Sequence, residues 1–311
     1  MKELLRSSVA RLASWLPAGI FTDKRFFELY QRRGWHATPV HYSRPVPDTS
    51  ALPSDLWERR SEMIGIDLGL DRQAELLREF SEQYLPEYHK ISDSPSPTNH
   101  AYYRGAGFGG IDGGVLYSMI RKHRPRRMIE VGAGMSTLLS ALALRRNAED
   151  AAEATTEFVA IDPHPRDYLL DEVPGLTRLV VKKVENVPLS EFTGLGENDI
   201  LFIDSSHVVR IGSDVVHTVL EILPRLRPGV IIHFHDIFMP YEYPQEWVLD
   251  RHRFWNEQYL VQAFLAFNDR FEILWSSASM HAYHPELLER VFAYFDSAKK
   301  QAASLWIRKL G

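Results

Sequence analysis

Cysteine is absent from this chain of 311 residues. Its absence excludes disulfide bonds, thiolate nucleophiles and zinc sites built on cysteine, and it favours an intracellular, cytoplasmic protein. Long apolar runs are also lacking, so we expect no segment that spans a membrane. There is no excess of basic residues either, because the net charge is −5 at pH 7. This balance argues against nucleic acid as a partner.

What the chain does contain, from residue 101 to its end, is an alternation of short apolar runs and amphipathic stretches. Apolar, β-branched runs divided by helical stretches predict a parallel sheet covered on both faces. We therefore predict a doubly wound α/β domain with strands at 128–132, 157–161, 177–182, 199–204, 229–235, 271–276 and 303–308. Helices are expected at 111–123, 135–146, 211–223, 251–268 and 284–298.

The first hundred residues differ in character. Four prolines between residues 39 and 53 make that stretch unsuited to a helix or a central strand. Apolar stripes predict helices at 3–16 and 71–84, and residues 92–98 are typical of a linker. We predict a helical and irregular N-terminal cap over residues 1–100 and a Rossmann-like domain over residues 101–311.

The most informative stretch is Met128–Thr137, where an apolar run ends in Gly132-Ala133-Gly134 and passes into a helix start. Glycines let the backbone bend and let a ligand approach, and the helix start offers free N–H groups. A dinucleotide-binding turn would carry a third glycine at the position of Thr137. Glu130 would also lie badly beside a pyrophosphate. An acid at this position suits a cationic ligand such as S-adenosylmethionine (SAM).

Three further stretches follow Glu130–Thr137 in order: Ile161–Pro163, Asp199–His207 and Arg227–Asp236. Together the four resemble class I SAM-dependent methyltransferases, most closely the branch of small-molecule and sugar O-methyltransferases of antibiotic pathways. The resemblance covers about residues 105–311 and implies a seven-stranded methyltransferase sheet whose last strand inserts antiparallel. It also implies SAM as cofactor, a small-molecule acceptor, and cofactor-binding residues Glu130, Gly132, Ala133, Gly134, Ser136 and Asp162.

Asp162 ends the second predicted strand, where an acid can accept both ribose hydroxyls of a nucleoside. The alternative is that Asp162 caps the turn before Pro163. Residues 237–247 follow the fifth strand, and their aromatic side chains, Tyr241, Tyr243 and Trp247, are candidates for holding a ring or a sugar. Packing of this loop onto the domain explains them equally well.

Methyl transfer from a sulfonium requires in-line alignment, and the acceptor oxygen must lose its proton. A histidine with a pKa of about 6.5 can assist a phenol near 10, whereas an alcohol, near 15.7 like water, benefits from a metal ion. Asp204 closes the fourth strand, His207 follows it, and Asp236 closes the fifth strand after His235. We predict His207 with Asp204 as the catalytic pair.

The same stretches predict Mg²⁺ or another divalent cation, held by Asp204, Asp236 and His235, with zinc left open by the histidines. Alternatively, these side chains only cap turns and hydrogen-bond to the backbone. Two other functions also stay open at this point. One is an NAD(P)-dependent oxidoreductase, and the other is a non-catalytic SAM-binding module. A homo-oligomer is compatible with the sequence.

Overall fold

The computed structural model describes residues 15, 19–20, 23–95, 101–151, 156–296 and 302–311. The helix predicted over 3–16 thus lies almost wholly outside the described residues. By its contacts the chain forms two compact units, Met1–Leu56 and Trp57–Gly311. In the first unit, helix α2 (Lys24–Arg32) begins after Asp23, whose carboxylate accepts the N–H of Arg25.

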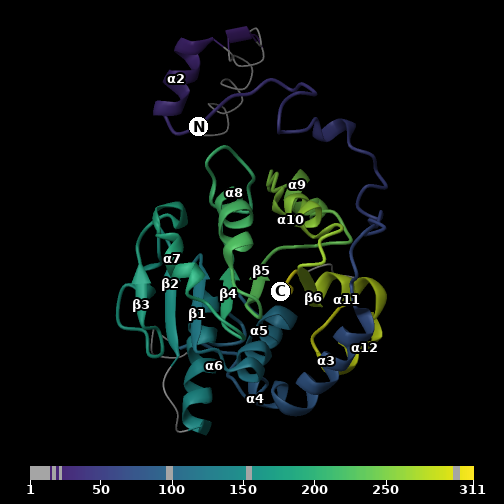
Figure 1. Cartoon of the computed structure of the whole chain (residues 1–311). Helices are drawn as coiled ribbons and strands as arrows, with labels where there is room; N and C mark the ends of the chain where they lie inside the picture. Colours follow the sequence, from purple (N-terminus) through teal and green to yellow (C-terminus); the bar gives the residue numbers. More distant parts are fainter. Residues whose placement is uncertain (1–14, 16–18, 21–22, 96–100, 152–155, 297–301) are drawn as a thin grey trace. The chain divides into compact units, whose positions relative to one another are not determined.

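The second unit contains a seven-stranded sheet with the order β3-β2-β1-β4-β5-β7-β6 (Figure 1). Its strands are β1 (Arg127–Val131), β2 (Glu157–Ile161), β3 (Arg178–Val180), β4 (Ile200–Ile203), β5 (Ile231–Phe234), β6 (Phe271–Ser276) and β7 (Leu305–Lys309). Strands β1 to β5 pair in parallel, and β7 runs antiparallel to both of its neighbours. The predicted seven-stranded Rossmann-like sheet with an antiparallel last strand is therefore confirmed.

Helices cover the sheet on both faces because alternate side chains of each strand point to opposite sides. Met128 of β1 belongs to one buried cluster and Ile129 to the other. The first cluster contains residues of α3 (Leu70–Gln83), α4 (Leu85–Tyr88), α5 (Gly110–His123), α6 (Met135–Ala151), α11 (Ser277–Tyr283) and α12 (Pro285–Val291). The second contains residues of α7 (Leu189–Thr193), α8 (Asp214–His217) and its continuation to Arg225, and α10 (Glu257–Leu265). The doubly wound prediction is correct.

Two predicted helices are too long. The first is α12, which ends at Val291, where the sequence predicts a helix over 284–298. The second is the helix around α10. The structure has helix only over α10, Glu257–Leu265, where the sequence predicts residues 251–268, and a short α9 (Gln245–Leu249) precedes it. Before α10 the backbone bonds to other parts of the chain: the N–H of Arg253 donates to the Trp247 carbonyl, and that of Asn256 to the His207 carbonyl. Because these tertiary bonds replace the helical ones, residues 251–256 form a connecting loop.

Helices α3 and α4 pack within the second unit. The amide oxygen of Gln73 in α3 accepts the N–H of Ser276 at the end of β6, with 2.7 Å between the two atoms. The boundary between the two units therefore lies before these helices. The division into a cap over residues 1–100 and a domain over residues 101–311 stays a prediction.

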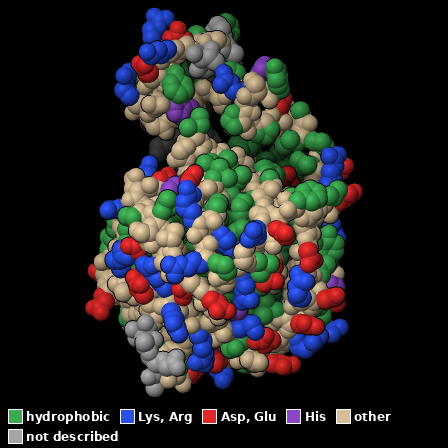
Figure 2. Space-filling view, in the orientation of Figure 1, with side chains coloured by type: hydrophobic (Ala, Val, Ile, Leu, Met, Phe, Trp, Pro, Cys, Tyr) green, Lys and Arg blue, Asp and Glu red, His purple; other side chains and the backbone are tan. Residues whose placement is uncertain are grey.

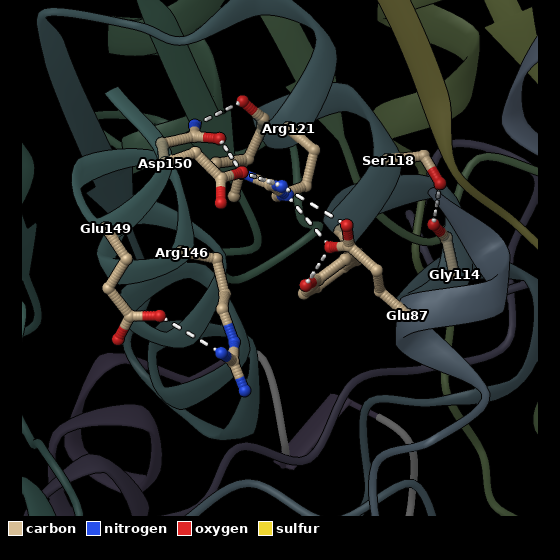
Figure 3. A network of polar contacts seen from close by, with 10 residues as sticks. Glu87, Gly114, Ser118, Arg121, Arg146, Glu149 and Asp150 are labelled. Atoms are coloured by element: carbon tan, nitrogen blue, oxygen red, sulfur yellow. Dashed lines mark hydrogen bonds and ion pairs between the residues drawn. The ribbon is translucent and has the colours of Figure 1, made fainter. Parts of the chain in front are cut away.

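A buried arginine joins α4, α5 and α6 (Figure 3). Arg121 of α5 pairs with Glu87 of α4 and with Asp150 of α6, and it also donates to the amide oxygen of Asn147. Ions away from bulk water need such partners, since desolvation is otherwise costly. The network holds α6, the helix that follows the Gly132 turn, against its neighbours.

Acidic and basic side chains are mixed over the face of the second unit that Figure 2 shows. Among the described residues, none of the helices combines the length and the apolar composition needed to cross a membrane.

Candidate active site

The turn after β1 depends on one glycine. Gly132 has a φ of 87°, and a Cβ added to it would lie 1.7 Å from the carbonyl oxygen of Asp204. The N–H of Asp204 donates to the Val131 carbonyl (2.8 Å), and the N–H of Gly132 donates to the Ile161 carbonyl (2.9 Å). The backbone that leaves β4 therefore lies directly against this turn. A Cβ added to Gly134 would meet no other atom within 4 Å, and Gly134 has no positive φ.

Asp162 closes the same turn from the side of β2. One carboxylate oxygen accepts the N–H of Ala133 (2.9 Å), and the other accepts the N–H of His164 (2.6 Å). Asp162 thus caps the backbone around Pro163, as one of the two sequence interpretations expects. Its role toward a ribose stays a prediction.

Glu130 lies beneath the turn and is fully buried. Its Oε1 accepts the hydroxyl of Ser136 at 2.5 Å, while Oε2 has no hydrogen-bond partner among the described residues. Burial raises the pKa of Glu130 to about 8. Glu130 and Ser136 are thus enclosed, whereas Gly132, Ala133 and Gly134 are partly exposed.

Three side chains converge where β4 and β5 end. Ligand atoms of Asp204, His207 and Asp236 all lie within 4.8 Å of one another. Nε2 of His207 is 3.2 Å from Oδ1 of Asp204 and 3.6 Å from Oδ2 of Asp236. Because β4 and β5 pair in parallel, their carboxyl ends meet at one sheet edge, as the sequence analysis requires. We call Asp204, His207 and Asp236 the carboxylate–histidine group.

A fourth residue, which the sequence analysis did not assign to the site, contacts this group. Glu257 begins α10 and is 1% exposed. Its Oε2 is 2.9 Å from Nδ1 of His207. The two residues are fifty positions apart, so no local pattern indicates that they pair.

The electrostatics of the group follow from burial and from opposite charges. Burial opposes a charge on His207, but hydrogen bonds and attraction from Asp204 and Glu257 outweigh it and raise the pKa of His207 to about 10. Burial also opposes the charge of Asp204, yet His235 and His207 lower its pKa. Burial raises the pKa of both Asp236 and Glu257. One buried carboxyl group, that of Glu257, and two partly buried ones, those of Asp204 and Asp236, thus surround one imidazole ring.

His233 in β5 and His235 just after it have different surroundings. Nε2 of His235 is 3.7 Å from Oδ1 of Asp236, and the ring lies 4.7 Å from that of Phe108, between centroids. His235 does not belong to the three residues with converging ligand atoms. His233 stacks on Phe202 at 4.0 Å, and its Nε2 pairs with the hydroxyl of Ser304 at 3.1 Å. His233 is therefore a core residue.

Aromatic side chains border the carboxylate–histidine group. The ring of Trp255 lies 4.3 Å from that of His207, and Trp247 packs edge-on against Trp255 at 5.1 Å, between centroids. Tyr241 and Tyr243 are buried, and the Tyr243 hydroxyl accepts the N–H of Gln258. Of the predicted acceptor-binding residues, Trp247 and Tyr243 both contact the ring of Trp255, with 5.1 and 6.4 Å between ring centroids.

A comparison with known protein families matches the central part of the second unit. Residues 129–237 match the family model described as "Methyltransferase domain". This segment extends from β1 past the end of β5 and contains the Gly132 turn, Asp162 and the carboxylate–histidine group. Over these residues the chain thus matches a methyltransferase domain, in agreement with the methyltransferase that the sequence predicts.

The individual proteins that resemble this chain share less than a third of their residues with it. A curated "uncharacterized protein" of Archaeoglobus fulgidus is 28% identical over 174 residues, which cover 52% of this chain and 75% of that protein. An O-methyltransferase of Bacillus cereus, solved with S-adenosylhomocysteine (SAH), is 14% identical over 78% of this chain and 91% of its own, with a TM-score of 0.36. An SAH-bound methyltransferase of Podospora anserina is 17% identical over 88% of this chain and 100% of its own, with a TM-score of 0.37.

We predict that Gly132→Ala destabilises the protein by at least about 3 kcal/mol or prevents folding, because overpacking against a backbone oxygen adds to the strain of a positive φ. The matched variant Gly134→Ala should change the free energy of unfolding by less than about 1 kcal/mol, since its Cβ meets open space. Urea unfolding measures both. Equal stabilities of the two variants would contradict the close contact at Gly132.

We also predict a pH-dependent effect of Glu130→Gln. A carboxyl group with a raised pKa in the folded state stabilises the protein below its ordinary pKa and loses that contribution as the pH rises toward the folded value. For Glu130 this window extends from 4.5 to about 8. From pH 5 to pH 8, the free energy of unfolding should therefore fall by roughly 2–4 kcal/mol more in the wild type than in Glu130→Gln.

Urea unfolding of the ligand-free protein at both pH values measures this difference. The exposed Glu149, which pairs with Arg146 on its own helix, provides the control Glu149→Gln, whose pH profile should follow the wild type. If Glu130→Gln also follows the wild type, Glu130 is not held neutral by burial.

Proposed function

We propose that this protein transfers the methyl group of SAM to a hydroxyl group of a small molecule, with the help of a divalent cation. The observation that carries the proposal is the contact between Gly132 and the backbone of Asp204. A donor bound at the turn after β1 would lie beside the carboxylate–histidine group at the end of β4. Methyl transfer requires such closeness of donor and acceptor, because the displacement is in line.

The Gly132 turn supports the choice of SAM. Gly132, Ala133 and Gly134 are the partly exposed residues of the turn, and α6 begins directly after them with its positive dipole end. That end suits the carboxylate of the methionine part of SAM. Asp162 reaches the same turn and is the residue we propose for the ribose hydroxyls. Glu130 and Ser136 would act from beneath, by holding the turn.

The carboxylate–histidine group fits a hard divalent cation, Mg²⁺ or Mn²⁺, because it combines two carboxylates with one imidazole nitrogen. The carboxyl groups of Asp204, Asp236 and Glu257 all lie within 4 Å of a nitrogen of His207, and such a cluster of acids favours a bound cation as well. We propose Asp204, His207 and Asp236 as the residues that would hold it, with His235 beside Asp236. A bound cation would lower the pKa of an acceptor hydroxyl.

The protein's own residues supply alignment and a proton site. Trp255 and Trp247 form a wall beside His207 against which an acceptor ring or sugar can pack. Without the ion, Asp204 and Glu257 raise the pKa of His207 to about 10, so Nε2 can take the acceptor proton only after the imidazolium has lost its own proton there, while Nδ1 stays engaged with Glu257. This is the base role that the sequence predicts, and it uses the same atom as cation binding.

The rival functions fit the site less well. A pyrophosphate-binding turn uses a third glycine, but Thr137 is fully buried here and its hydroxyl accepts the N–H of Gly134. A non-catalytic module has no need of a carboxylate–histidine group beside the turn. The finer resemblance, to small-molecule and sugar O-methyltransferases, is part of the proposal, and so is a cytoplasmic location.

Isothermal titration with SAM, SAH, NAD⁺ and NADP⁺ tests the cofactor. We expect the two sulfur nucleosides to bind and the two dinucleotides not to bind. Binding of NAD⁺ without binding of SAH would overturn the methyltransferase assignment for this chain.

Transfer from methyl-labelled SAM to a panel of catechols, phenols and sugars tests the chemistry. Activity should be lost on exhaustive chelation and restored by Mg²⁺ or Mn²⁺. Asp236→Asn should lower it by about 10²-fold or more, as loss of a charged catalytic interaction does. Full activity in the chelated enzyme would remove the cation from the proposal while leaving SAM in place.

A further inference from the structure

Glu257 is a buried acid that has no role in the proposed function so far. It lies outside the segment that matches the methyltransferase domain. Its Oε2 faces Nδ1 of His207 at 2.9 Å, and its Oε1 has no hydrogen-bond partner among the described residues. A carboxylate is costly to bury unless a charged or hydrogen-bonding partner compensates, so its place requires a reason.

The start of α10 is fastened to the His207 segment by several bonds. The N–H groups of Asn256 and Glu257 both donate to the carbonyl of His207, at 3.1 and 3.2 Å. The side-chain oxygen of Asn256 accepts the N–H of Val209. Trp255 lies against the imidazole ring itself. These contacts fix the position from which Glu257 reaches Nδ1.

On the opposite side of the ring, Nε2 faces Asp204 and Asp236. A carboxylate at Nδ1 keeps the proton on that nitrogen, and Nε2 then presents its lone pair when it is not protonated. Carboxylates that hold a metal-binding histidine in this way fix its tautomer and orientation and increase its basicity as a ligand.

We infer that Glu257 is a positioning residue: it holds the proton of His207 on Nδ1 and turns Nε2 toward the carboxylates of Asp204 and Asp236. This inference deepens the proposed function and rests on it for the cation. The contact between Glu257 and Nδ1 of His207, on which the inference rests, does not depend on a bound cation. Glu257 acts through His207 and needs no contact with the acceptor.

Binding of Mn²⁺ to the full chain tests the inference. Glu257→Gln keeps the shape and one acceptor oxygen but loses the charge, and Glu257→Leu loses both. We expect Mn²⁺ affinity to fall about 10-fold in Glu257→Gln and about 100-fold in Glu257→Leu, the range that such outer partners control. Glu246→Gln is the control: Glu246 is exposed in α9 and pairs with Arg251, and its affinity should equal that of the wild type.

NMR of the protein with ¹⁵N-labelled histidine, without metal, provides the second readout. The wild type should show a His207 Nδ1–H proton shifted downfield by its carboxylate partner, and Glu257→Leu should lose that shift. Thermal unfolding shows whether each variant is folded, and the isosteric Glu257→Gln keeps the test decisive if Glu257→Leu is not.

The two readouts separate the possible failures. If folded Glu257 variants bind Mn²⁺ as tightly as the wild type, the positioning role is wrong. If the wild type binds no Mn²⁺, the proposed function loses its divalent cation. The NMR signal of the His207 Nδ1–H then decides alone whether Glu257 is a positioning residue. An unshifted Nδ1–H in the wild type would overturn it.

Discussion

The site depends on the absence of a side chain at Gly132. With no Cβ there, the carbonyl of Asp204 can lie against the turn after β1, while the N–H of Asp204 bonds to Val131. Two neighbouring parallel strands thus leave the sheet in contact with each other. One strand end forms the turn that we propose for the donor, and the other carries the first member of the carboxylate–histidine group. Any larger residue at position 132 would push the end of β4 away from the turn after β1.

The second constraint is the set of carboxyl groups that lie close to one another around His207. Asp204, Asp236 and Glu257 surround His207 at a sheet edge covered by Trp255. Such a group is tolerated only if its carboxylates have hydrogen-bond partners and positive charge nearby. The imidazole supplies part of that charge, and a divalent cation would supply the rest. The two ring nitrogens of His207 thus have different partners: Nδ1 faces Glu257, and Nε2 faces the two aspartates.

The sequence was sufficient for the sheet and for part of the site. Short β-branched runs predict all seven strands, and the adjacency of β4 and β5 explains why Asp204 and Asp236 could be expected to converge. Local patterns could not show that residues 251–256 leave the helix, because tertiary backbone bonds decide that. For the same reason they could not pair Glu257 with His207, and only the packed structure shows Glu130 enclosed beneath its turn.

The most direct measurement is the anomalous diffraction of crystals soaked with Mn²⁺ and SAH. The account predicts a manganese peak about 2.2 Å from carboxylate oxygens of Asp204 and Asp236, together with SAH density against the Gly132 turn. SAH bound elsewhere in the protein, or a manganese peak that avoids both aspartates while SAH occupies the turn, would contradict it.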